Sequence, residues 1–264
     1  MLEIKNIYKT FNPGTINEKV ALNGLSLKLN EGDFVTVIGG NGAGKSTMLN
    51  AVAGVWPVDE GQIIIDGTDV TKLSEYKRAA YLGRVFQDPM TGTAATMGIE
   101  ENLALAKRRG KTRFLRSGIT KAEREEYKEL LKILNLGLED RLTSKVGLLS
   151  GGQRQTLTLL MATLQKPKLL LLDEHTAALD PKTAAKVLDI TDRIVNRDHL
   201  TTLMITHNMK DAIAHGNRLI MMMNGKIILD IQGEEKKKLT VKQLLDKFEE
   251  ASGEEFSNDS AILG

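Results

Sequence analysis

Eight consecutive residues in the first fifth of the chain combine four glycines with a lysine and a serine. They read Gly39-Gly-Asn-Gly-Ala-Gly44-Lys45-Ser46 and directly follow an apolar run over residues 34–38. Glycines let successive backbone N–H groups turn inward around an anion, and a helix that begins here adds its positive end. The spacing G-x-x-x-x-G-K-[ST] between a strand and a helix predicts a loop that binds the phosphates of a nucleoside triphosphate. A glycine-rich turn that matches by accident is the alternative.

Each position of this loop has an expected role. Lys45 is expected to reach the β- and γ-phosphates, and the hydroxyl of Ser46 or Thr47 is expected to face Mg²⁺ or a phosphate oxygen. The residues predicted to contact the nucleotide here are Gly39, Asn41, Gly42, Ala43, Gly44, Lys45, Ser46 and Thr47.

Two acids, Asp173 and Glu174, follow a run of four leucines at residues 169–172. A buried strand can deliver a carboxylate to the carboxyl edge of an open α/β sheet, where ligands bind. Asp173 suits Mg²⁺, which it would hold through water, and Glu174 suits the general base that polarises an attacking water. The alternative is that both acids only end a strand at its solvated edge.

A third string, Leu149-Ser150-Gly151-Gly152-Gln153, lies shortly before these acids. Ser150 supplies a hydroxyl, the two glycines let backbone N–H groups approach, and a helix from Gln153 would point its positive end at an anion. This string resembles the signature of ATP-binding cassette (ABC) proteins, which P-loop kinases, G proteins and helicases lack. A plain Ser-Gly-Gly turn that caps a helix is the alternative.

Further positions are similar to motifs of the ABC family. Gln87 resembles the glutamine that senses Mg²⁺ and the attacking water, and Asp180 resembles the loop that crosses the dimer interface. His207 resembles the switch histidine that contacts the γ-phosphate. Phe11 resembles the aromatic residue that stacks on adenine, with Tyr8 as the second candidate. Taken singly, each also has an ordinary structural explanation.

The resemblance implies an ATPase that uses ATP and Mg²⁺ and works as a head-to-tail homodimer. Each complete site would take the nucleotide loop, Gln87, Asp173, Glu174 and His207 from one copy, and the signature from the other. The catalytic residues implied are Glu174, His207 and Gln87, and the metal-binding residues are Ser46, Gln87 and Asp173. The remaining nucleotide contacts implied are Phe11, Asp180 and the signature residues Ser150, Gly151, Gly152 and Gln153.

Strands and helices that could position these residues alternate along the chain. Strands are predicted at residues 20–29, 34–38, 62–65, 169–172, 203–206 and 219–223. Helix starts are predicted at Thr120 and Thr240 by capping-box patterns, and at Asp180 because a proline follows it. This order predicts a mostly parallel sheet covered on both faces. The fold class expected is therefore α/β: a P-loop core with antiparallel N-terminal strands and an inserted helical subdomain.

We expect one domain over residues 1–250. Its parts are a core at residues 1–87 and 161–235, a helical subdomain at 88–160 and a short C-terminal helix at 240–250. Residues 251–264 are small and polar and are expected to form a flexible tail. The 264 residues carry a net charge of +2 and no cysteine, which argues against a nucleic-acid partner, disulfides and cysteine-ligated metals.

Two multi-spanning permease subunits and, indirectly, an extracellular solute-binding protein are the partners that the resemblance implies. No apolar run is long enough to cross a membrane, so a transport role requires these separate membrane subunits. The resemblance then implies a peripheral location at the cytoplasmic face of the cell membrane. The sequence around His175 is similar to that of a bacterial subgroup of ABC proteins associated with lipoprotein-dependent uptake of small solutes, with aromatic amino acids among the candidate solutes. The function that the resemblance implies is therefore that of the ATPase subunit of an importer. A soluble ATPase of iron–sulfur assembly and an exporter subunit are the alternatives. The basic residues at 107–116 could meet an anionic surface or form a solvated loop.

Overall fold

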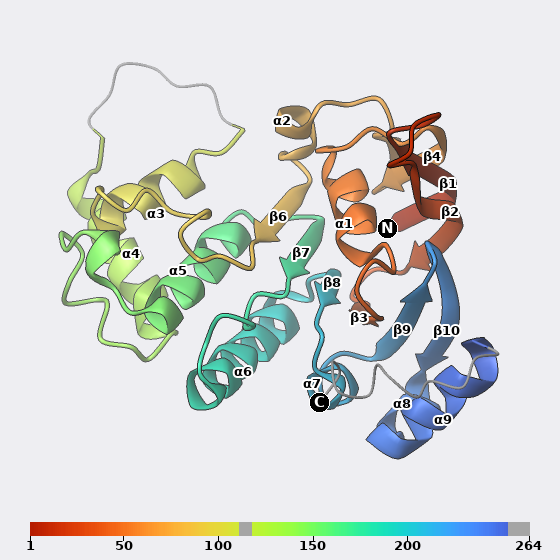
Figure 1. Cartoon of the computed structure of the whole chain (residues 1–264). Helices are drawn as coiled ribbons and strands as arrows, with labels where there is room; N and C mark the ends of the chain where they lie inside the picture. Colours follow the sequence, from red (N-terminus) through yellow and green to blue (C-terminus); the bar gives the residue numbers. More distant parts are fainter. Residues whose placement is uncertain (111–117, 253–264) are drawn as a thin grey trace.

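The computed structural model describes residues 1–110 and 118–252, and in these it contains two β-sheets with helices between and around them (Figure 1). The N-terminus lies in the smaller sheet, and the last described helix lies beside the edge of the larger one.

The larger sheet has six strands in the order β10-β9-β3-β8-β7-β6. All neighbouring pairs are parallel except β10 with β9. The bounds are Phe34–Ile38 for β3, Leu82–Val85 for β6, Leu169–Asp173 for β7, Thr202–Ile205 for β8, Arg218–Met223 for β9 and Lys226–Gln232 for β10. The prediction of a mostly parallel sheet is confirmed. Both faces of its central strands are buried, which is why they are continuous apolar runs in the sequence.

The smaller sheet is antiparallel, with the order β2-β1-β4-β5. Its strands are β1 (Leu2–Phe11), β2 (Lys19–Leu29), β4 (Glu60–Ile65) and β5 (Thr68–Asp69). The antiparallel N-terminal strands expected from the family resemblance are therefore present, and the α/β fold class is confirmed.

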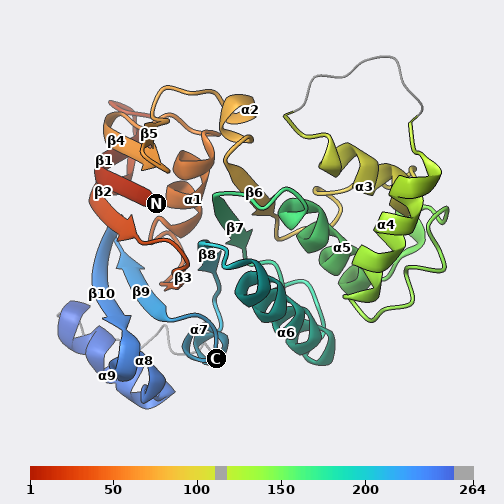
Figure 2. The same ribbon diagram turned by 180° about the vertical axis from the view of Figure 1, so that it is seen from behind.

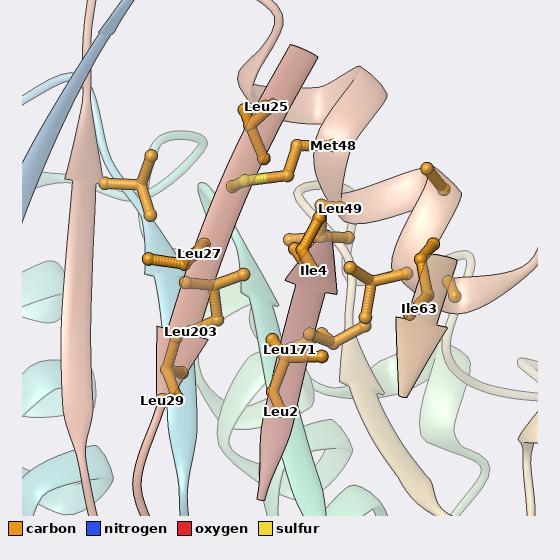
Figure 3. Close-up of a cluster of buried hydrophobic side chains, with 14 of the residues drawn as sticks. Leu2, Ile4, Leu25, Leu27, Leu29, Met48, Leu49, Ile63, Leu171 and Leu203 are labelled. Carbon is orange, nitrogen blue, oxygen red and sulfur yellow. The ribbon is translucent and has the colours of Figure 1, made fainter. Parts of the chain in front are cut away.

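The helix that follows the glycine-rich loop, α1 (Lys45–Ala53), packs in the core between the two sheets (Figures 1 and 3). Met48 and Leu49 of this helix lie among Leu25 and Ile4 of the small sheet and Leu171 of the large one. All five side chains are at most 2% exposed. Burial on two sides holds the start of α1 in place, and with it the glycine-rich loop.

Two further clusters cover the rest of the large sheet. Alternate leucines of β7 point to opposite faces, so Leu171 packs on α1 whereas Leu172 packs under α5 (Gly151–Thr163) and α6 (Pro181–Asp198). At the β10 edge, α7 (Met209–Ala214), α8 (Gly233–Lys237) and α9 (Val241–Ser252) lie together. Leu244 and Phe248 of α9 are buried there, which confirms the predicted short C-terminal helix as part of the core.

Helices occupy the stretch between β6 and β7. They are α3 (Ile99–Lys107), α4 (Lys121–Lys132), the 3₁₀ turn Val146–Leu148 and α5; the short α2 (Glu75–Arg78) precedes β6. Figure 2 shows α3 and α4 on the far side of α5 from the two sheets. The helix α5 packs against α3 and also against β6 and α6, so the predicted subdomain boundaries at residues 88 and 160 stay a prediction.

The predicted helix starts are confirmed. The side chains of Thr120, Asp180 and Thr240 each accept a hydrogen bond from the backbone N–H three residues later. Most of the predicted C-terminal tail, residues 253–264, lies outside the described residues.

Four strands were absent from the sequence-based expectation: β1, the two-residue β5, β6 and β10. In β1 the apolar alternation slips, because the backbone has a bulge between Ile4 and Ile7, where Asn6 has a φ of 45°. β6 is short and contains Gly83. β10 follows a turn at Asn224 and Gly225, a hairpin signal that could have identified it.

Candidate functional site

A pocket of about 240 Å³ opens over the start of α1. Its wall consists of residues 41–47, Phe11, Lys19, Ala21 and Glu174. Seven of the eight predicted loop contacts therefore face one space, together with the predicted base Glu174. The eighth, Gly39, lies behind the wall, where its carbonyl accepts a hydrogen bond from the Lys45 ammonium at 2.6 Å.

Glycine is required at two positions of this loop. Gly39 has a φ of 148° and Gly44 a φ of 100°, both in the region that side chains rarely adopt. A Cβ on Gly39 would lie 2.2 Å from the carbonyl oxygen of Met222, and one on Gly44 would lie 2.5 Å from that of Ala21. The loop is thus pressed against β9 on one side and β2 on the other, which fixes its curl.

Lys45 is the cation at the centre of the loop. Its ammonium donates to the carbonyls of Gly39 and Gly40, at 2.6 and 3.2 Å. Burial lowers its pKa, while Glu174 and Asp173 oppose that change. A buried ammonium held only by two carbonyls and facing two carboxylates is suited to receive phosphate oxygens.

The two acids at the end of β7, Asp173 and Glu174, differ in environment. Asp173 lies 3.5 Å from the guanidinium of Arg84, and burial raises its pKa although Arg84 opposes the shift. Glu174 lines the pocket and has a φ of 45°, unusual for a residue other than glycine. Its backbone N–H donates to Ile205 of the neighbouring strand β8, which holds this conformation. Strained backbone of this kind is concentrated at functional positions, which supports Glu174 as the base.

His207 lies at the end of β8, beside these acids. Its Nδ1 is 3.6 Å from a carboxylate oxygen of Glu174, and its side chain is 54% exposed. The structure thus brings together Lys45, Asp173, Glu174 and His207 from three parallel strand ends, as the sequence motifs predicted. Their catalytic and metal-binding roles stay predictions.

Phe11 and Tyr8 were the two candidates for stacking on the base. Phe11 lines the pocket, and its ring meets Trp56 edge to face at 5.0 Å. The hydroxyl of Tyr8 instead lies against Gly24, within 2.8 Å of where a Cβ would be. Among the described residues the geometry therefore favours Phe11.

Gln87 is exposed, two residues after the end of β6, and does not line the pocket. The preceding carbonyl of Phe86 accepts a hydrogen bond from Gln155 of α5 at 3.0 Å, which ties this segment to the signature helix. The structure therefore does not bring Gln87 to the pocket, and its catalytic and metal-binding roles stay predictions.

The signature residues lie elsewhere, at the start of α5. Ser150 caps this helix: its hydroxyl accepts the N–H of Gln153, and the Gln153 side chain accepts the N–H of Ser150. Neither residue, nor Gly151 or Gly152, lines the pocket. One chain thus holds the two predicted nucleotide-contacting surfaces apart.

Both signature glycines face α6 and the loop that precedes it. A Cβ on Gly152 would lie 2.2 Å from Thr183, and one on Gly151 would lie 3.3 Å from Leu179. Asp180 is the N-cap of α6, and hydrogen bonds with Thr183 lower its pKa. The predicted interface residue Asp180 is therefore placed next to the signature.

The site offers oxygen donors to Mg²⁺. Among residues 1–110 and 118–252 no group of three or more His, Cys, Asp or Glu side chains could form a metal cage. The hydroxyl of Ser46 and the carboxylate of Asp173 are nevertheless hard donors, and Mg²⁺ often binds through one or two such groups together with phosphates and water. These residues fit a magnesium ion that arrives with a nucleotide.

Sequence reasoning missed two cations at this site. Lys19 is the strand partner of Phe11 and lines the pocket, with its ammonium 3.3 Å from where a Cβ of Gly42 would be. Arg84 is the ion-pair partner of Asp173. No short motif contains either residue; their contacts cross between strands, so only the pairing of the strands reveals them.

The predicted basic cluster at residues 107–116 lies only partly within the described chain. Lys107 and Arg108 form ion pairs with Glu126 and Glu123 of α4. Residues 111–116 are outside the described residues, so the two interpretations of this cluster stay open.

Comparison with known proteins gives a consistent result. The family model described as ABC transporter matches residues 22–177. The chain is 47% identical over 256 residues to a tyrosine transport ATP-binding protein of Clostridioides difficile, an alignment that covers 95% of this chain and 100% of the relative. It is 33% identical over 232 residues to a spermidine/putrescine import ATP-binding protein of Haemophilus influenzae, covering 87% of this chain but 57% of that relative.

Among solved structures, a dimeric ATP-binding cassette in a post-hydrolysis state with ADP and Pi bound resembles the chain with a TM-score of 0.74. The sequences are 30% identical, and the alignment covers 88% of this chain and 98% of the other.

Proposed function

The chain belongs to the ABC transporter family, and from that premise we propose that it drives the uptake of an aromatic amino acid such as tyrosine through separate membrane subunits. It is an ATP-binding subunit of the import type and an ATP hydrolase. The observation that carries the proposed solute is the 47% identity to the tyrosine transport ATP-binding protein along that relative's whole length. Neither the exporter nor the iron–sulfur assembly alternative is favoured by the relatives found.

Hydrolysis follows from the groups around the pocket. When ATP binds, Lys45 exchanges its two carbonyl acceptors for oxygens of the β- and γ-phosphates. Glu174 then accepts the proton of the attacking water, and His207, 3.6 Å from Glu174, steadies the γ-phosphate end of the site. Mg²⁺, held by Ser46 and Asp173, would neutralise charge on the β- and γ-phosphates.

A complete site in this proposal takes two copies of the chain. The nucleotide loop provides donors and a cation at one place, whereas the signature presents the start of α5 at another. The similarity to a dimeric cassette supports a head-to-tail arrangement, in which Ser150–Gln153 of one copy closes on the ATP held by the other.

Mixing two inactive variants tests this arrangement. Lys45→Ala removes the phosphate cation, and Ser150→Arg blocks the signature, so each variant alone should lose ATPase activity. A mixed dimer would contain one site in which both halves are intact. We expect ATPase activity to reappear on mixing, and its absence while mixed dimers are shown to form would contradict the two-copy site.

Membrane partners are the second part of the proposal. No helix in the described part of the chain is long and apolar enough to cross a membrane. The relatives are named as a tyrosine transport and a spermidine/putrescine import ATP-binding protein, which supports two permease subunits as partners and a solute-binding protein outside the membrane. The proposed location is the cytoplasmic face of the cell membrane.

The solute and the partners can be tested together in the cell of origin. We expect the tagged chain to co-purify with multi-spanning proteins from detergent-solubilised membranes, and a Lys45→Ala replacement to abolish uptake of labelled tyrosine. Uptake of labelled lysine in the same cells is the control. Normal tyrosine uptake in the Lys45→Ala cells would contradict the proposed solute while leaving the ATPase assignment intact.

A further inference from the structure

Arg84 is a half-buried arginine on β6, three residues before Gln87. One of its terminal nitrogens, Nη2, donates to the side-chain oxygen of Asn50 on α1 at 2.7 Å. The same nitrogen lies 3.5 Å from a carboxylate oxygen of Asp173 at the end of β7. The guanidinium also stacks over the ring of Phe86, 4.5 Å from its centroid. One side chain thus contacts α1, β7 and the segment that leads to Gln87.

Arg78, another buried arginine nearby, shows what a purely structural guanidinium looks like in this fold. It donates to four backbone carbonyls, those of Ala51, Val52, Thr71 and Leu73, and all three of its nitrogens are used. The Nε of Arg84, in contrast, is buried and has no hydrogen-bond partner among the described residues. An unsatisfied buried donor destabilises a fold, so hydrogen bonding of the backbone does not explain why an arginine occupies this position.

Charge offers a better explanation. The charges that act on Asp173 are the cations Arg84 and Lys45 and the neighbouring carboxylate of Glu174. Arg84 is the cation in direct contact with Asp173, a residue that we assign to Mg²⁺. A divalent ion that approaches this carboxylate therefore also approaches the fixed positive charge of Arg84, and like charges a few ångströms apart repel each other.

We propose that Arg84 is a positioning residue that sets the Mg²⁺ dependence of nucleotide binding. Its guanidinium holds the carboxylate of Asp173 when no ion is present and competes with Mg²⁺ for it when MgATP arrives. Because Arg84 also stacks on Phe86, a displacement of the segment before Gln87 changes how firmly Asp173 is held. This inference rests on the proposed ATP and Mg²⁺ site.

Trp56 makes the inference measurable without any assay of hydrolysis. It is the single tryptophan of the chain, and it contacts Phe11 at the wall of the pocket. Its fluorescence can report the dissociation constant of ATP in the presence of EDTA and, separately, with excess Mg²⁺. The ratio of the two constants is the quantity that Arg84 should control.

The variant Arg84→Met keeps an unbranched side chain against Phe86 and removes the charge. Without it, metal-free ATP loses an attractive cation, whereas Mg²⁺ gains sole access to Asp173. We expect the ratio of the metal-free to the Mg²⁺ dissociation constant to rise on the order of tenfold. Arg84→Lys, which keeps the charge, should stay close to the wild-type ratio. The control Arg193→Met removes an exposed arginine of α6 and should leave both constants unchanged.

A merely structural role predicts a different result. If Arg84 only supports the fold, Arg84→Met should raise the metal-free and the Mg²⁺ dissociation constants of ATP by the same factor. An unchanged ratio of the two constants would overturn the proposal. A chain that binds ATP neither with nor without Mg²⁺ in its wild-type form would instead contradict the nucleotide site itself. The two failures are therefore distinguishable.

Discussion

Two helix N-termini in this chain carry glycines and are assigned to the same ligand, yet they are built differently. The start of α1 has no side-chain cap, because its N-cap residue is Gly44, which has a φ of 100°. The first residues of the helix line the pocket, Lys45 among them, so no side chain of the cap competes with a ligand for their backbone N–H groups. The start of α5 is capped by its own Ser150 and Gln153, and no cation lies in its first turn other than Arg154.

The glycines of the two ends also serve different purposes. Those of the α1 loop allow a backbone conformation that side chains rarely adopt. Gly151 and Gly152 of α5 have ordinary backbone conformations, and they are small because Leu179 and Thr183 pack against them. The start of α1 therefore offers uncapped backbone N–H groups to a pocket. The start of α5, in contrast, is capped by its own side chains and lines no part of that pocket, so a ligand has to come from outside this pocket.

Arg154 keeps the second end in shape. Its guanidinium is buried and donates to the carbonyls of Val146, Gly147 and Leu149, so it fixes the turn before the signature rather than facing a ligand. Lys45 has the same kind of carbonyl contacts but lines the pocket. Of these two helix starts, only that of α1 therefore has a cation, Lys45, that is available to a phosphate.

The largest effect is expected from adding a methyl group to the glycine at the start of α1. Gly44→Ala forces a Cβ to within 2.5 Å of the Ala21 carbonyl oxygen at an unfavourable φ. We expect it to raise the ATP dissociation constant at least a hundredfold, measured by Trp56 fluorescence. The matched variant Gly151→Ala at α5 meets only the end of a leucine side chain, so it should leave ATP binding within about twofold. Equal losses in both variants would remove the distinction between the ends.

The helix α6 lies between the signature and the segment after Glu174, and it gives the second prediction. Thr183 of α6 touches Gly152, and Thr191 is 3.1 Å from the buried His175 that follows Glu174. Burial, assisted by His215, lowers the pKa of His175 to about 4. The unfolded chain therefore takes up this proton first as the pH falls. The contribution of neutral His175 to stability is complete above pH 6.5 and is lost between about pH 6.5 and 4.

This loss amounts to on the order of 3 kcal/mol in the free energy of unfolding. His175→Gln cannot take up the proton, so its stability should fall less steeply over that interval, as measured by urea unfolding at several pH values. His199→Asn, which alters an exposed histidine at the end of α6, should keep the wild-type slope. If His175→Gln also keeps the wild-type pH dependence of the free energy of unfolding, the buried histidine is not the source of that dependence.

Removing the side-chain cap of α5 tests whether the signature contributes to stability and hydrolysis but not to ATP binding by a single chain. Ser150→Ala loses the bond from the N–H of Gln153, which should lower the free energy of unfolding by about 1 kcal/mol. Because the signature does not line the pocket, ATP binding to a single chain should be unchanged, whereas ATPase activity should be lost. Thermal unfolding, fluorescence and phosphate release test the three parts. Weakened ATP binding by the monomer would place the signature in the site of its own chain.

The smallest effect concerns Lys19, the second cation of the α1 pocket. Its side chain is exposed, so Lys19→Gln should raise the ATP dissociation constant about threefold, since an exposed charge pair contributes at most about 1 kcal/mol. AMP, which lacks the β- and γ-phosphates, should bind with nearly unchanged affinity. Lys28→Gln, on the same strand but paired with Glu3, is the control. An equal effect on AMP would assign Lys19 to the base or ribose instead.

The sequence alone determined the features that depend on neighbouring residues. The glycine loop, the acids after β7 and the caps at Thr120, Ser150 and Asp180 are contiguous strings. Their bonds join residues within about one helical turn, so the local pattern is enough to predict them. The apolar runs of the large sheet were predictable for a related reason, because strands buried on both faces need apolar residues at every position.

Only the tertiary structure decided which distant residues meet. The contact of Arg84 with Asp173 and Asn50, the placement of Lys19 over the loop and the choice of Phe11 over Tyr8 all depend on strand pairings between segments far apart in the chain. A single sequence carries no local signal for such pairings, because they are fixed by how α1 and the two sheets pack around one shared core. The order of residues therefore shows which groups can do the chemistry, and the packing of the core decides which charges surround them.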